Sequence, residues 1–544
     1  MNDLLTVENL NVDFLSGLMR VEAVRNVSFT VAPSEILGIV GESGSGKSVS
    51  CRAVLGLLPG HARVNGRIIY DGKDLGAMSA NELSLTRGRD ISMIFQNPSS
   101  HLDPLMTIGD HVAEPLHYHF GLDKKNARIK ALELLDVVKI QNPEQRYTAY
   151  PHELSGGMKQ RVLIASALAC QPRMLLADEP TTALDVTVQA SILELLKSLN
   201  RDHGLSMIFV SHDLGVIAEI CDRVVVMRGG EIVEQGSVNQ VVGNPQHEYT
   251  RLLIGSQPGR LDSYNQPSHE GHALLEIEQL SVRFNDKGGL GTLLGGRSRA
   301  VNALDNININ IRSGETFGIV GESGSGKSTI ARAVVRLIEA TSGAIVFQGK
   351  LVGDLKGLDL VEYRRQVQMI FQNPYDSLNP RASVRQTIAE PIWRHGLATQ
   401  QDANERAIEL MAMVELSENL ANRRPRQLSG GQCQRVAIAR ALALSPRLLI
   451  ADEVTSALDV TIQAQVLKLL ARLKDSQDLT IIYISHDLAV VRKFCDRVAV
   501  LRHGKLIETG LTDKVFDQPA NDYTRTLIDA APELDSALLN AAAL

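Results

Sequence analysis

The sequence has no long apolar run and no signal-like start. None of its apolar stretches approaches the roughly 18 residues that a membrane-spanning helix needs. The first ten residues, MNDLLTVENL, carry acidic side chains and have no basic start before an apolar stretch, unlike a secretory signal. We therefore expect the chain to stay in the cytoplasm, so that any association with a membrane depends on a partner.

An excess of basic side chains is also missing. The chain has 56 Lys and Arg against 62 Asp and Glu, a formal net charge of −6. A nucleic-acid-binding surface usually needs a basic stripe, so we expect no nucleic-acid partner. Five cysteines are scattered without the spacing of a metal site, and we interpret each as a small buried hydrophobe. They are Cys51, Cys170, Cys221, Cys433 and Cys495.

What the sequence does have is an internal repeat. The eleven letters GIVGESGSGKS occur at 38–48 and again at 318–328. IFQNP, LSGG, ADE and SHDL then follow in the same order in both halves. The period is far longer than the roughly 20–50 residues of solenoid repeats, so the pattern indicates duplication of a whole domain. We expect domains at 1–258 and 273–532, a polar linker with Gly and Pro at 259–272, and a short helical or frayed tail at 533–544.

Within each half, short β-branched runs alternate with helical stretches. We expect buried strands at 35–40, 173–178 and 206–212, and again at 315–320, 447–452 and 480–486. The stretches 123–140 and 402–416 have the pattern of amphipathic helices. Strands that alternate with helices predict an α/β fold with a mainly parallel sheet in each domain.

The repeated glycine-rich sequence fits the P-loop pattern G-x-x-x-x-G-K-[ST]. Its glycines allow backbone N–H groups to cradle phosphate oxygens, and the following helix directs its positive end at the same phosphates. The lysine places a charge on the β- and γ-phosphates, and the last serine offers a hydroxyl to Mg²⁺. The candidate residues are Gly41, Ser43, Gly44, Gly46, Lys47 and Ser48, and Gly321, Ser323, Gly324, Gly326, Lys327 and Ser328.

Acidic pairs end the second predicted strand of each half. Asp178 and Asp452 are placed to hold the shell of Mg²⁺. Glu179 and Glu453 follow directly, where a carboxylate orients or deprotonates the attacking water. An acidic pair at a strand end can also simply face solvent, but an upstream P-loop favours the catalytic interpretation.

Two further polar positions recur at strand ends. His212 and His486 stand within Ser-His-Asp-Leu in both halves, which favours a sensor of the γ-phosphate over a structural histidine. Gln96 and Gln372 follow β-rich runs, where a neutral amide can reach Mg²⁺ or the lytic water.

A second glycine-containing sequence, LSGG, precedes a helical stretch in each half. Its residues Ser155 and Gly157, and Ser429 and Gly431, predict another phosphate-binding helix start. Since the P-loop already serves the nucleotide of its own domain, the second site needs the ATP of a partner domain.

The ordered set of motifs resembles a tandem ABC ATPase over nearly the whole chain. The resemblance implies P-loop NTPase domains, each with a parallel core, an antiparallel β-subdomain and a helical subdomain, that pair head to tail around two ATP molecules with Mg²⁺. Site one would combine the P-loop, Gln, Asp, Glu and His of the first half with Ser429 and Gly431; site two would combine those of the second half with Ser155 and Gly157. Phe14 and Phe284 lie where the family stacks an aromatic ring on adenine, although either can equally serve packing.

Finer matches resemble the oligopeptide, dipeptide and nickel branch of ABC importers in fused form. They include PQHEYTRLLI at 245–254 and QPANDYTRTLI near 518–528, the sequences that follow each IFQNP, and the run before the second P-loop. This implies an ATP-hydrolysing subunit on the cytoplasmic face of the inner membrane, with two permease subunits and, indirectly, an extracytoplasmic solute-binding protein. Docking is expected in 98–150 and 374–424, and short peptides or related small solutes are the expected cargo.

The sequence also departs from the branch. Met158 replaces the usual signature Gln, and Val454 stands where Pro180 follows the catalytic Glu in the first half. Some relatives carry a C-terminal cysteine cluster; this chain has no cysteine after 495, so we expect no iron–sulfur cluster. The alternatives are a non-transport tandem ABC factor or the ATPase of a phosphonate-breakdown complex. The short, nearly uncharged linker and the lack of zinc cysteines favour transport over the tandem factor.

Overall fold

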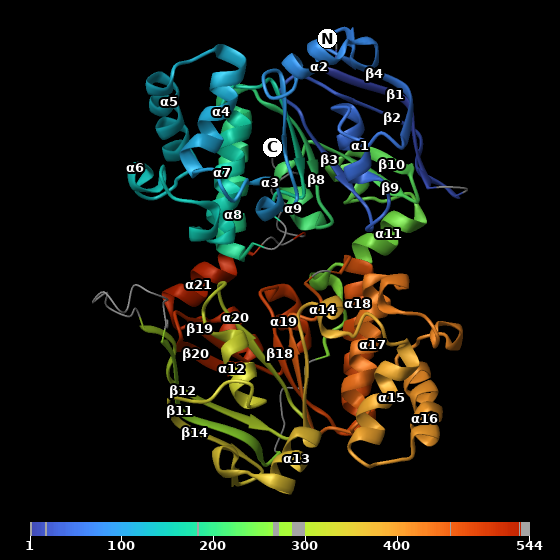
Figure 1. The fold of residues 1–544 in the computed structure, drawn as a ribbon, viewed down its shortest axis with the longest axis vertical. Coiled ribbons are helices and arrows are strands. Elements are labelled where there is room, and N and C mark those ends of the chain that lie inside the picture. The colour runs from blue at the N-terminus through green and yellow to red at the C-terminus, as the bar shows by residue number, and fades with distance from the viewer. Residues whose placement is uncertain are drawn as a thin grey trace. The chain divides into compact units, whose positions relative to one another are not determined.

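The computed structural model describes residues 3–16, 19–181, 184–264, 271–285, 300–456, 458–531 and 534. The chain forms two compact units, the first built mainly from residues 1–260 and the second mainly from residues 261–531 (Figure 1). Each unit contains two sheets and a group of helices.

A six-stranded sheet forms the centre of the first unit, in the order β10-β9-β3-β8-β7-β6. The strands from β9 to β6 run parallel, and only β10 is antiparallel. Strands β3, β7 and β8 are completely buried, as near-continuous apolar runs in a covered parallel sheet should be. The bounds are β3 Ile36–Val40, β6 Ile91–Ile94, β7 Met174–Asp178, β8 Ser206–Val210, β9 Arg223–Arg228 and β10 Glu231–Ser237.

A second, antiparallel sheet has the order β2-β1-β4-β5. Its long strand β1 (Leu5–Ser16) pairs with β2 (Met19–Val31) on one side and with β4 (Ala62–Tyr70) on the other. The short β5 (Lys73–Asp74) completes the sheet. This is the antiparallel subdomain that the resemblance implied.

The helices of the first unit divide between the central sheet and a helical subdomain. Figure 1 shows α4, α5 and α7 grouped on one side of the first unit, and these helices share a buried core that includes Val112, Ala131 and Val162. The bounds are α1 Lys47–Val54, α2 Ala80–Thr86, α3 Pro98–His101, α4 Ile108–Phe120, α5 Lys124–Val137, α6 Pro143–Arg146, α7 Gly156–Leu168, α8 Val186–His203, α9 Leu214–Ile220, α10 Val238–Val241 and α11 Glu248–Gly255.

The second unit repeats both sheets with the same neighbours. The central sheet has the order β16-β17-β18-β13-β19-β20 and the antiparallel one β12-β11-β14-β15. The strands are β11 Ala273–Asn285, β12 Ala300–Arg312, β13 Thr316–Val320, β14 Ser342–Phe347, β15 Lys350–Leu351, β16 Val367–Ile370, β17 Leu448–Asp452, β18 Thr480–Ile484, β19 Arg497–Arg502 and β20 Lys505–Leu511. The helices are α12 Lys327–Val334, α13 Gly357–Gln366, α14 Pro374–Ser377, α15 Val384–Arg394, α16 Gln400–Met413, α17 Gly430–Leu442, α18 Val460–Gln477, α19 Leu488–Phe494, α20 Thr512–Asp517 and α21 Asp522–Asp529.

The predicted elements agree with these bounds. Strands predicted at 35–40, 173–178 and 447–452 are β3, β7 and β17, and the helices predicted at 123–140 and 402–416 are α5 and α16. The fold class is therefore confirmed, with the parallel core, antiparallel subdomain and helical subdomain all present. In the described part of the chain, no helix combines the length and apolar character needed to cross a bilayer.

The predicted linker at 259–272 is described only at its ends. Residues 261–264 belong to the second unit, where the backbone N–H of Tyr264 donates to the carbonyl of Lys493 at 2.7 Å. The Tyr264 ring meets the edge of Phe494 with ring centroids 6.4 Å apart. Residues 265–270 and the predicted tail, apart from residue 534, lie outside the described residues.

Candidate functional site

The P-loop of the first unit connects the buried strand β3 to the start of α1, and glycine is required at its turns. Gly41 has φ +150°, and a Cβ there would lie 2.2 Å from the carbonyl oxygen of Met227. Gly46 has φ +100°, and a Cβ there would lie 2.7 Å from the carbonyl oxygen of Ala23. Gly321 and Gly326 repeat both the conformation and the close approach in the second unit. Only glycine fits these positions, and a glycine-rich turn of this kind allows backbone N–H groups to surround a phosphate.

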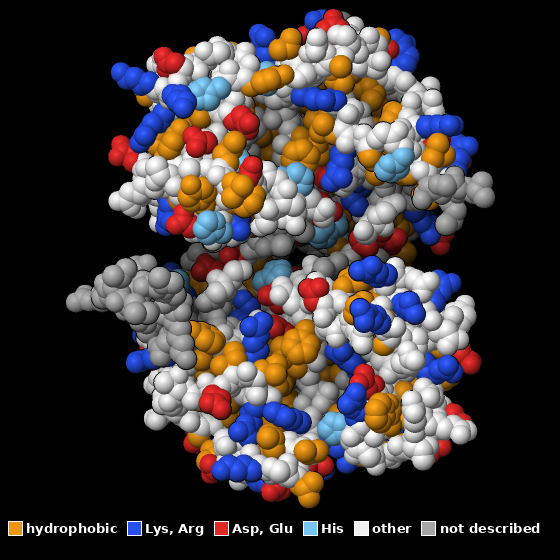
Figure 2. Space-filling model, viewed as in Figure 1, with side chains coloured by type: hydrophobic (Ala, Val, Ile, Leu, Met, Phe, Trp, Pro, Cys, Tyr) orange, Lys and Arg blue, Asp and Glu red, His pale blue; other side chains and the backbone are white. Residues whose placement is uncertain are grey.

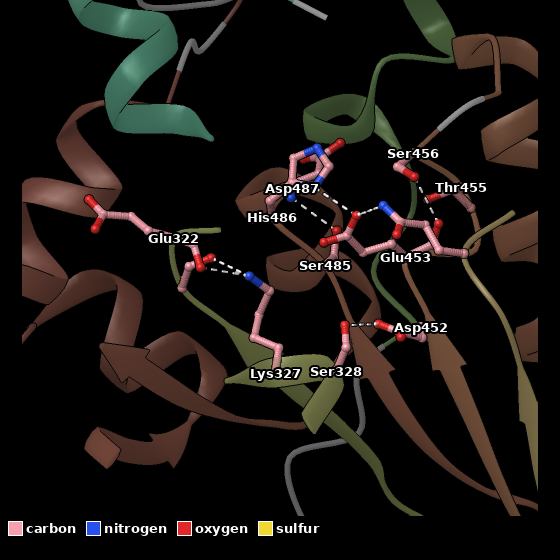
Figure 3. Close-up of polar contacts among 12 residues, drawn as sticks. Glu322, Lys327, Ser328, Asp452, Glu453, Thr455, Ser456, Ser485, His486 and Asp487 are labelled. Carbon is pink, nitrogen blue, oxygen red and sulfur yellow. Dashed lines mark hydrogen bonds and ion pairs between the residues drawn. The ribbon is translucent and has the colours of Figure 1, made fainter. Parts of the chain in front are cut away.

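The P-loop lysine is buried inside its own loop. Only 5% of Lys47 is exposed, and its Nζ donates to the carbonyl oxygens of Gly41 at 2.7 Å and Glu42 at 2.8 Å. Lys327 is equally buried and donates to Gly321 at 2.7 Å and Glu322 at 3.0 Å (Figure 3). Burial lowers the pKa of Lys47, against the raising effect of nearby acidic groups that include Glu179. A partly desolvated ammonium held this way is well prepared to meet an anion.

The P-loop serine and the strand-end aspartate meet in each unit. Ser48 Oγ donates to Asp178 Oδ1 at 2.7 Å, and Ser328 Oγ donates to Asp452 Oδ1 at 3.0 Å. Burial raises the pKa of both aspartates, and the serine hydroxyls act in the opposite direction. The other oxygen of Asp178, Oδ2, is buried without a hydrogen-bond partner and lies 3.8 Å from the Arg52 guanidinium.

The residue after each aspartate has an unusual backbone. Glu179 and Glu453 both have φ +48°, a conformation that non-glycine residues rarely adopt. The backbone N–H of Glu179 donates to the carbonyl of Val210 at 3.1 Å, and that of Glu453 donates to Ile484 at 2.9 Å. The adjacent strand therefore holds the strained residue in place, which is the pattern expected of a functional site.

Each of these glutamates is contacted by the predicted glutamine and histidine of its own unit. Gln372 Nε2 donates to Glu453 Oε2 at 2.6 Å. His486 Nδ1 lies 3.6 Å from the same oxygen (Figure 3). In the first unit Gln96 Nε2 donates to Glu179 Oε2 at 2.8 Å, and His212 Nδ1 lies 3.6 Å away. The structure thus brings together in each unit the P-loop, glutamine, aspartate, glutamate and histidine that sequence alone had associated.

The charges within this group influence one another. Burial by itself would lower the pKa of His486, but the hydrogen bond and charge of Glu453 outweigh it and raise that pKa. Burial would raise the pKa of Glu453, but His486 and Lys327 outweigh it and lower the pKa. The carboxylate is therefore ionised at neutral pH. The pKa of His212 is raised in the same way, with burial opposed by the hydrogen bond and charge of Glu179.

The predicted signature residues lie at helix starts. Ser155 is the N-cap of α7 and accepts from the N–H of Met158 at 3.4 Å. Ser429 caps α17, and there Gln432 Oε1 also accepts the N–H of Ser429 at 3.0 Å, which closes a reciprocal capping box. The helix starts therefore exist in both units, while their role toward a phosphate remains a prediction.

Packing supplies a reason for the second glycine of each signature that sequence reasoning missed. A Cβ at Gly157 would lie 2.6 Å from the Val188 side chain, and a Cβ at Gly431 would lie 2.6 Å from Ile462. Neither glycine has a left-handed backbone. These glycines are thus required for close contact with α8 and α18, whatever else they do.

The two predicted adenine-stacking residues differ. Phe284 lies on β11 and is 44% exposed, so its ring is accessible. Phe14 lies on β1, packs partly against the core, and has its ring centroid 5.8 Å from that of His61. Stacking on adenine remains a prediction for both, and the accessible Phe284 fits it better than Phe14.

Sequence reasoning also missed two tyrosines that contact the P-loops. The Tyr249 hydroxyl accepts the backbone N–H of Glu42, and the Tyr523 hydroxyl accepts that of Glu322. The repeated sequences around them, HEYTR and NDYTR, were the signal, because they recur at matched positions in both halves.

The chain is similar to known proteins along nearly its whole length. A family model described as ABC transporter matches residues 24–182 and 304–456, and one described as oligopeptide/dipeptide transporter, C-terminal region, matches 233–281 and 507–543. The glutathione import ATP-binding protein GsiA of Escherichia coli (strain K12) is 42% identical over 564 residues, covering 97% of this chain and 90% of the relative. GsiA of Pectobacterium atrosepticum is also 42% identical, covering 97% of this chain and 89% of the relative.

Two solved structures are each similar to less than half of this chain. The dimeric structure of the ATP-binding cassette MJ0796 bound to ADP and Pi has a TM-score of 0.40 and 30% identity, and covers 43% of this chain and 98% of that chain. The structure of cbiO1 from Clostridium perfringens has a TM-score of 0.39 and 30% identity, with 45% of this chain and 91% of that chain covered.

Proposed function

Because this chain belongs to the ABC transporter family, in its fused oligopeptide/dipeptide importer branch, we propose that its two units drive the uptake of short peptides through two permease subunits. The chain is an ATPase of the ABC type, with two ATP-binding cassettes. The observation that carries the proposal is the matched group of P-loop, glutamine, Asp-Glu pair and histidine in both units.

We assign the phosphate contacts to the P-loops. Lys47 and Lys327 would exchange their carbonyl partners for the β- and γ-phosphates of ATP, since those anions offer a stronger charge-assisted bond. Backbone N–H groups of each loop and the start of α1 or α12 would add to the same attraction. Gly44, Gly324, Ser43 and Ser323 complete the loops that surround the phosphates.

We assign hydrolysis to Glu179 and Glu453. Each carboxylate accepts a hydrogen bond from a glutamine amide and lies beside a histidine, so its orientation is fixed from two sides. An ionised carboxylate in this position orients the attacking water and accepts its proton. His212 and His486 would then report the presence of the γ-phosphate, and their raised pKa favours the charged form that an added phosphate attracts.

The residues that would hold Mg²⁺ are suited to it. The donors are all oxygens, from a serine hydroxyl, an aspartate carboxylate and a glutamine amide, and Mg²⁺ prefers such hard ligands. The buried Oδ2 of Asp178, which has no hydrogen-bond partner, is the kind of atom a cation would satisfy. The sets are Ser48, Gln96 and Asp178, and Ser328, Gln372 and Asp452. When bound, Mg²⁺ supplies charge neutralisation of the β- and γ-phosphate oxygens.

We further propose that the two ATP sites are composite. Each unit has one P-loop group and one capped signature helix, α7 or α17, whose start is a ready anion site. Site one would join the first P-loop to Ser429 and Gly431, and site two would join the second P-loop to Ser155 and Gly157. Binding of ATP would then bring the two units together around both nucleotides.

A hollow in the first unit suits a permease segment. A cavity of about 340 Å³ lies between β6, α3, α4 and α7, and its lining includes Phe95, His101, Glu114, Tyr118 and His119. Figure 2 shows hydrophobic side chains gathered in a hollow of this unit. Phe95 directly precedes Gln96, so a segment seated there would sense changes at the nucleotide. The permeases would hold the chain at the cytoplasmic face of the inner membrane.

The cargo class follows from the branch. The curated relatives are named for the import of glutathione, which is itself a tripeptide. We therefore propose short peptides as the cargo class, with glutathione as the first member to try. Selection of the cargo would rest with the permeases and an extracytoplasmic binding protein.

The nucleotide assignment is tested in the purified chain. Lys47→Ala and Lys327→Ala should each abolish productive turnover, because each removes the charge that meets a phosphate pair. Phosphate release at saturating ATP measures the effect, and exposed Lys124→Ala on α5 is the control. Wild-type turnover in the double lysine variant would contradict the assignment.

The transport assignment is tested in vesicles. The chain, its permeases and binding protein are reconstituted, and uptake of labelled glutathione, a dipeptide and a nickel chelate is compared. We expect peptide-loaded binding protein to stimulate ATP hydrolysis and drive peptide uptake. Uptake of the nickel chelate alone would overturn the cargo class and keep the importer. Absence of any permease complex would favour a non-transport complex instead.

A further inference from the structure

Each P-loop makes a hydrogen bond to a tyrosine of its own unit, and the proposed catalysis does not use this bond. The backbone N–H of Glu42 donates to the hydroxyl of Tyr249 at 3.1 Å. In the second unit the N–H of Glu322 donates to the hydroxyl of Tyr523 at 3.4 Å. Both tyrosines lie in the regions matched by the oligopeptide/dipeptide transporter C-terminal model. The same bond therefore joins the C-terminal region of each unit to its own P-loop.

Each tyrosine is fixed in place by its surroundings. Only 2% of Tyr249 and 7% of Tyr523 is exposed. The guanidinium of Arg228 lies over the Tyr249 ring at 4.9 Å, and that of Arg502 lies over the Tyr523 ring at 4.5 Å. Burial raises the pKa of Tyr249 to about 12, so the phenol stays neutral at physiological pH. A buried ring under an arginine leaves the hydroxyl little freedom to move.

The tyrosines lie on α11 and α21, and the start of this helix is held in the same way in both units. The carboxylate of Glu234 on β10 accepts the backbone N–H groups of Gln246 and His247 at 2.8 and 3.1 Å. Glu508 on β20 accepts those of Ala520 and Asn521 at 2.9 and 3.2 Å. This carboxylate clamp ties the segment before α11 or α21 to the central sheet. The tyrosine therefore links the P-loop to a fixed point of the fold.

The contacted residue is the one that also holds the P-loop lysine. The carbonyl of Glu42 accepts from Lys47 Nζ at 2.8 Å, while its N–H donates to Tyr249. Glu322 stands in the same relation to Lys327. When the lysine turns to a phosphate, the bond to the tyrosine can persist, because it is made by the other end of the residue. The tyrosine thus fixes this part of the loop independently of the nucleotide.

We propose that Tyr249 and Tyr523 are positioning residues by which the C-terminal region of each unit sets the affinity of the adjacent P-loop for ATP. The inference rests on the proposed role of the P-loops in binding ATP. A loop held in its binding conformation loses less conformational freedom when the ligand binds. Removal of the hydroxyl should therefore weaken ATP binding more than it slows the chemical step.

The test is Tyr249→Phe in full-length protein that also carries Lys327→Ala, so that the first P-loop dominates ATP binding. Binding is measured by titration with ATP and Mg²⁺, and melting by circular dichroism. We expect ATP to bind about three- to tenfold more weakly, the range for loss of one hydrogen bond. In the chain with wild-type Lys327, Tyr249→Phe should raise the KM for ATP and leave kcat within about twofold.

Controls separate this effect from a general loss of structure. Leu252→Ala on the same helix, at a side chain 55% exposed, should change neither affinity nor KM. Hydrogen exchange of the backbone amides in 41–44 should quicken in Tyr249→Phe and not in Leu252→Ala. Tyr523→Phe with Lys47→Ala is the matched experiment in the second unit.

The outcomes are distinguishable. A lower melting temperature with unchanged ATP affinity would make the tyrosine merely structural and overturn the proposal, as would a loss confined to kcat. If Lys47→Ala itself left ATP binding unchanged, the proposed role of the P-loop would fail whatever Tyr249→Phe does.

Discussion

The two units carry the same catalytic group but differ in what supports it. The distances from serine to aspartate, glutamine to glutamate and histidine to glutamate agree within 0.3 Å between the units. The signature helices do not agree, because Gln432 closes a capping box on Ser429, whereas Met158 packs against the core and makes no reciprocal capping bond to Ser155. The duplication has thus kept the chemistry fixed while the supporting contacts changed.

A second difference between the units concerns one matched position on helices α8 and α18. In the second unit Lys474 forms a buried ion pair with Asp496 at 3.0 Å, with side chains 7% and 3% exposed. In the first unit Asn200 occupies the matched position and donates to the backbone carbonyls of Ser34 and Leu205. The same helix position therefore holds an asparagine bonded to carbonyls in the first unit and a lysine in a buried ion pair in the second.

Removal of the catalytic carboxylates should have the largest effect on turnover and should reveal any difference between the two sites. Changing both Glu179 and Glu453 to Gln should keep ATP binding and lower hydrolysis by a factor of about 100 or more, since each carboxylate acts on the water. In the proposed pairing, Glu179 works with the fully capped Ser429, so Glu179→Gln alone should remove the larger share of the rate. Steady-state phosphate release checks this, and equal losses from the two single variants would contradict the asymmetry.

The buried ion pair predicts unequal stability. Lys474→Met should remove the cationic partner of the buried Asp496 carboxylate, which keeps its hydrogen bond from the backbone N–H of Thr316, and cost about 3 kcal/mol or more in the free energy of unfolding. The second unit should then melt at a lower temperature than the first, which calorimetry resolves as two transitions. Asn200→Ala in the first unit is the matched control and should cost only about 1 kcal/mol per lost hydrogen bond. One unchanged transition in Lys474→Met would rule out this difference.

The smallest effect concerns the signature caps. Met158→Gln should complete the capping box of α7 and raise the rate of the proposed site two by about two- to fivefold, through a helix start fixed more firmly. The measurement uses a Glu179→Gln background, where site two supplies the remaining turnover. Gln432→Met in that background should leave the residual rate unchanged, and a gain there would contradict the assignment of helices to sites.

Much of this arrangement could be predicted because the same motifs occur in the same order in both halves of the sequence. The apolar strands that end in Asp178 and Asp452, and those that lead into Gly41 and Gly321, appear in the sequence as buried runs. The carboxyl ends of such parallel strands meet at one edge of the sheet. The group around Glu179 follows from that topology. Its φ of +48° does not, because the preference for this backbone comes from the neighbouring strand.

Contacts between distant parts of the sequence were beyond prediction. The packing of Gly157 on Val188, the bond from Glu42 to Tyr249 and the burial of Asp496 each depend on how helices lie against a sheet. Residue types at these positions are compatible with many neighbours. The repeated tyrosine marked a position of interest, but only the fold shows what it touches.

The left-handed backbone at Glu179 and Glu453 links turnover to the rigidity of the central sheet at the carboxyl ends of its strands. Such a conformation costs on the order of 1 kcal/mol, and it persists only while the surrounding structure imposes it. On heating, the carboxyl ends of β7 and β8 should loosen before the unit unfolds, and the glutamate would then relax to an ordinary conformation with its carboxylate displaced. Thermal inactivation should therefore precede loss of the fold, so the range of working temperatures is narrower than the range over which the protein stays folded.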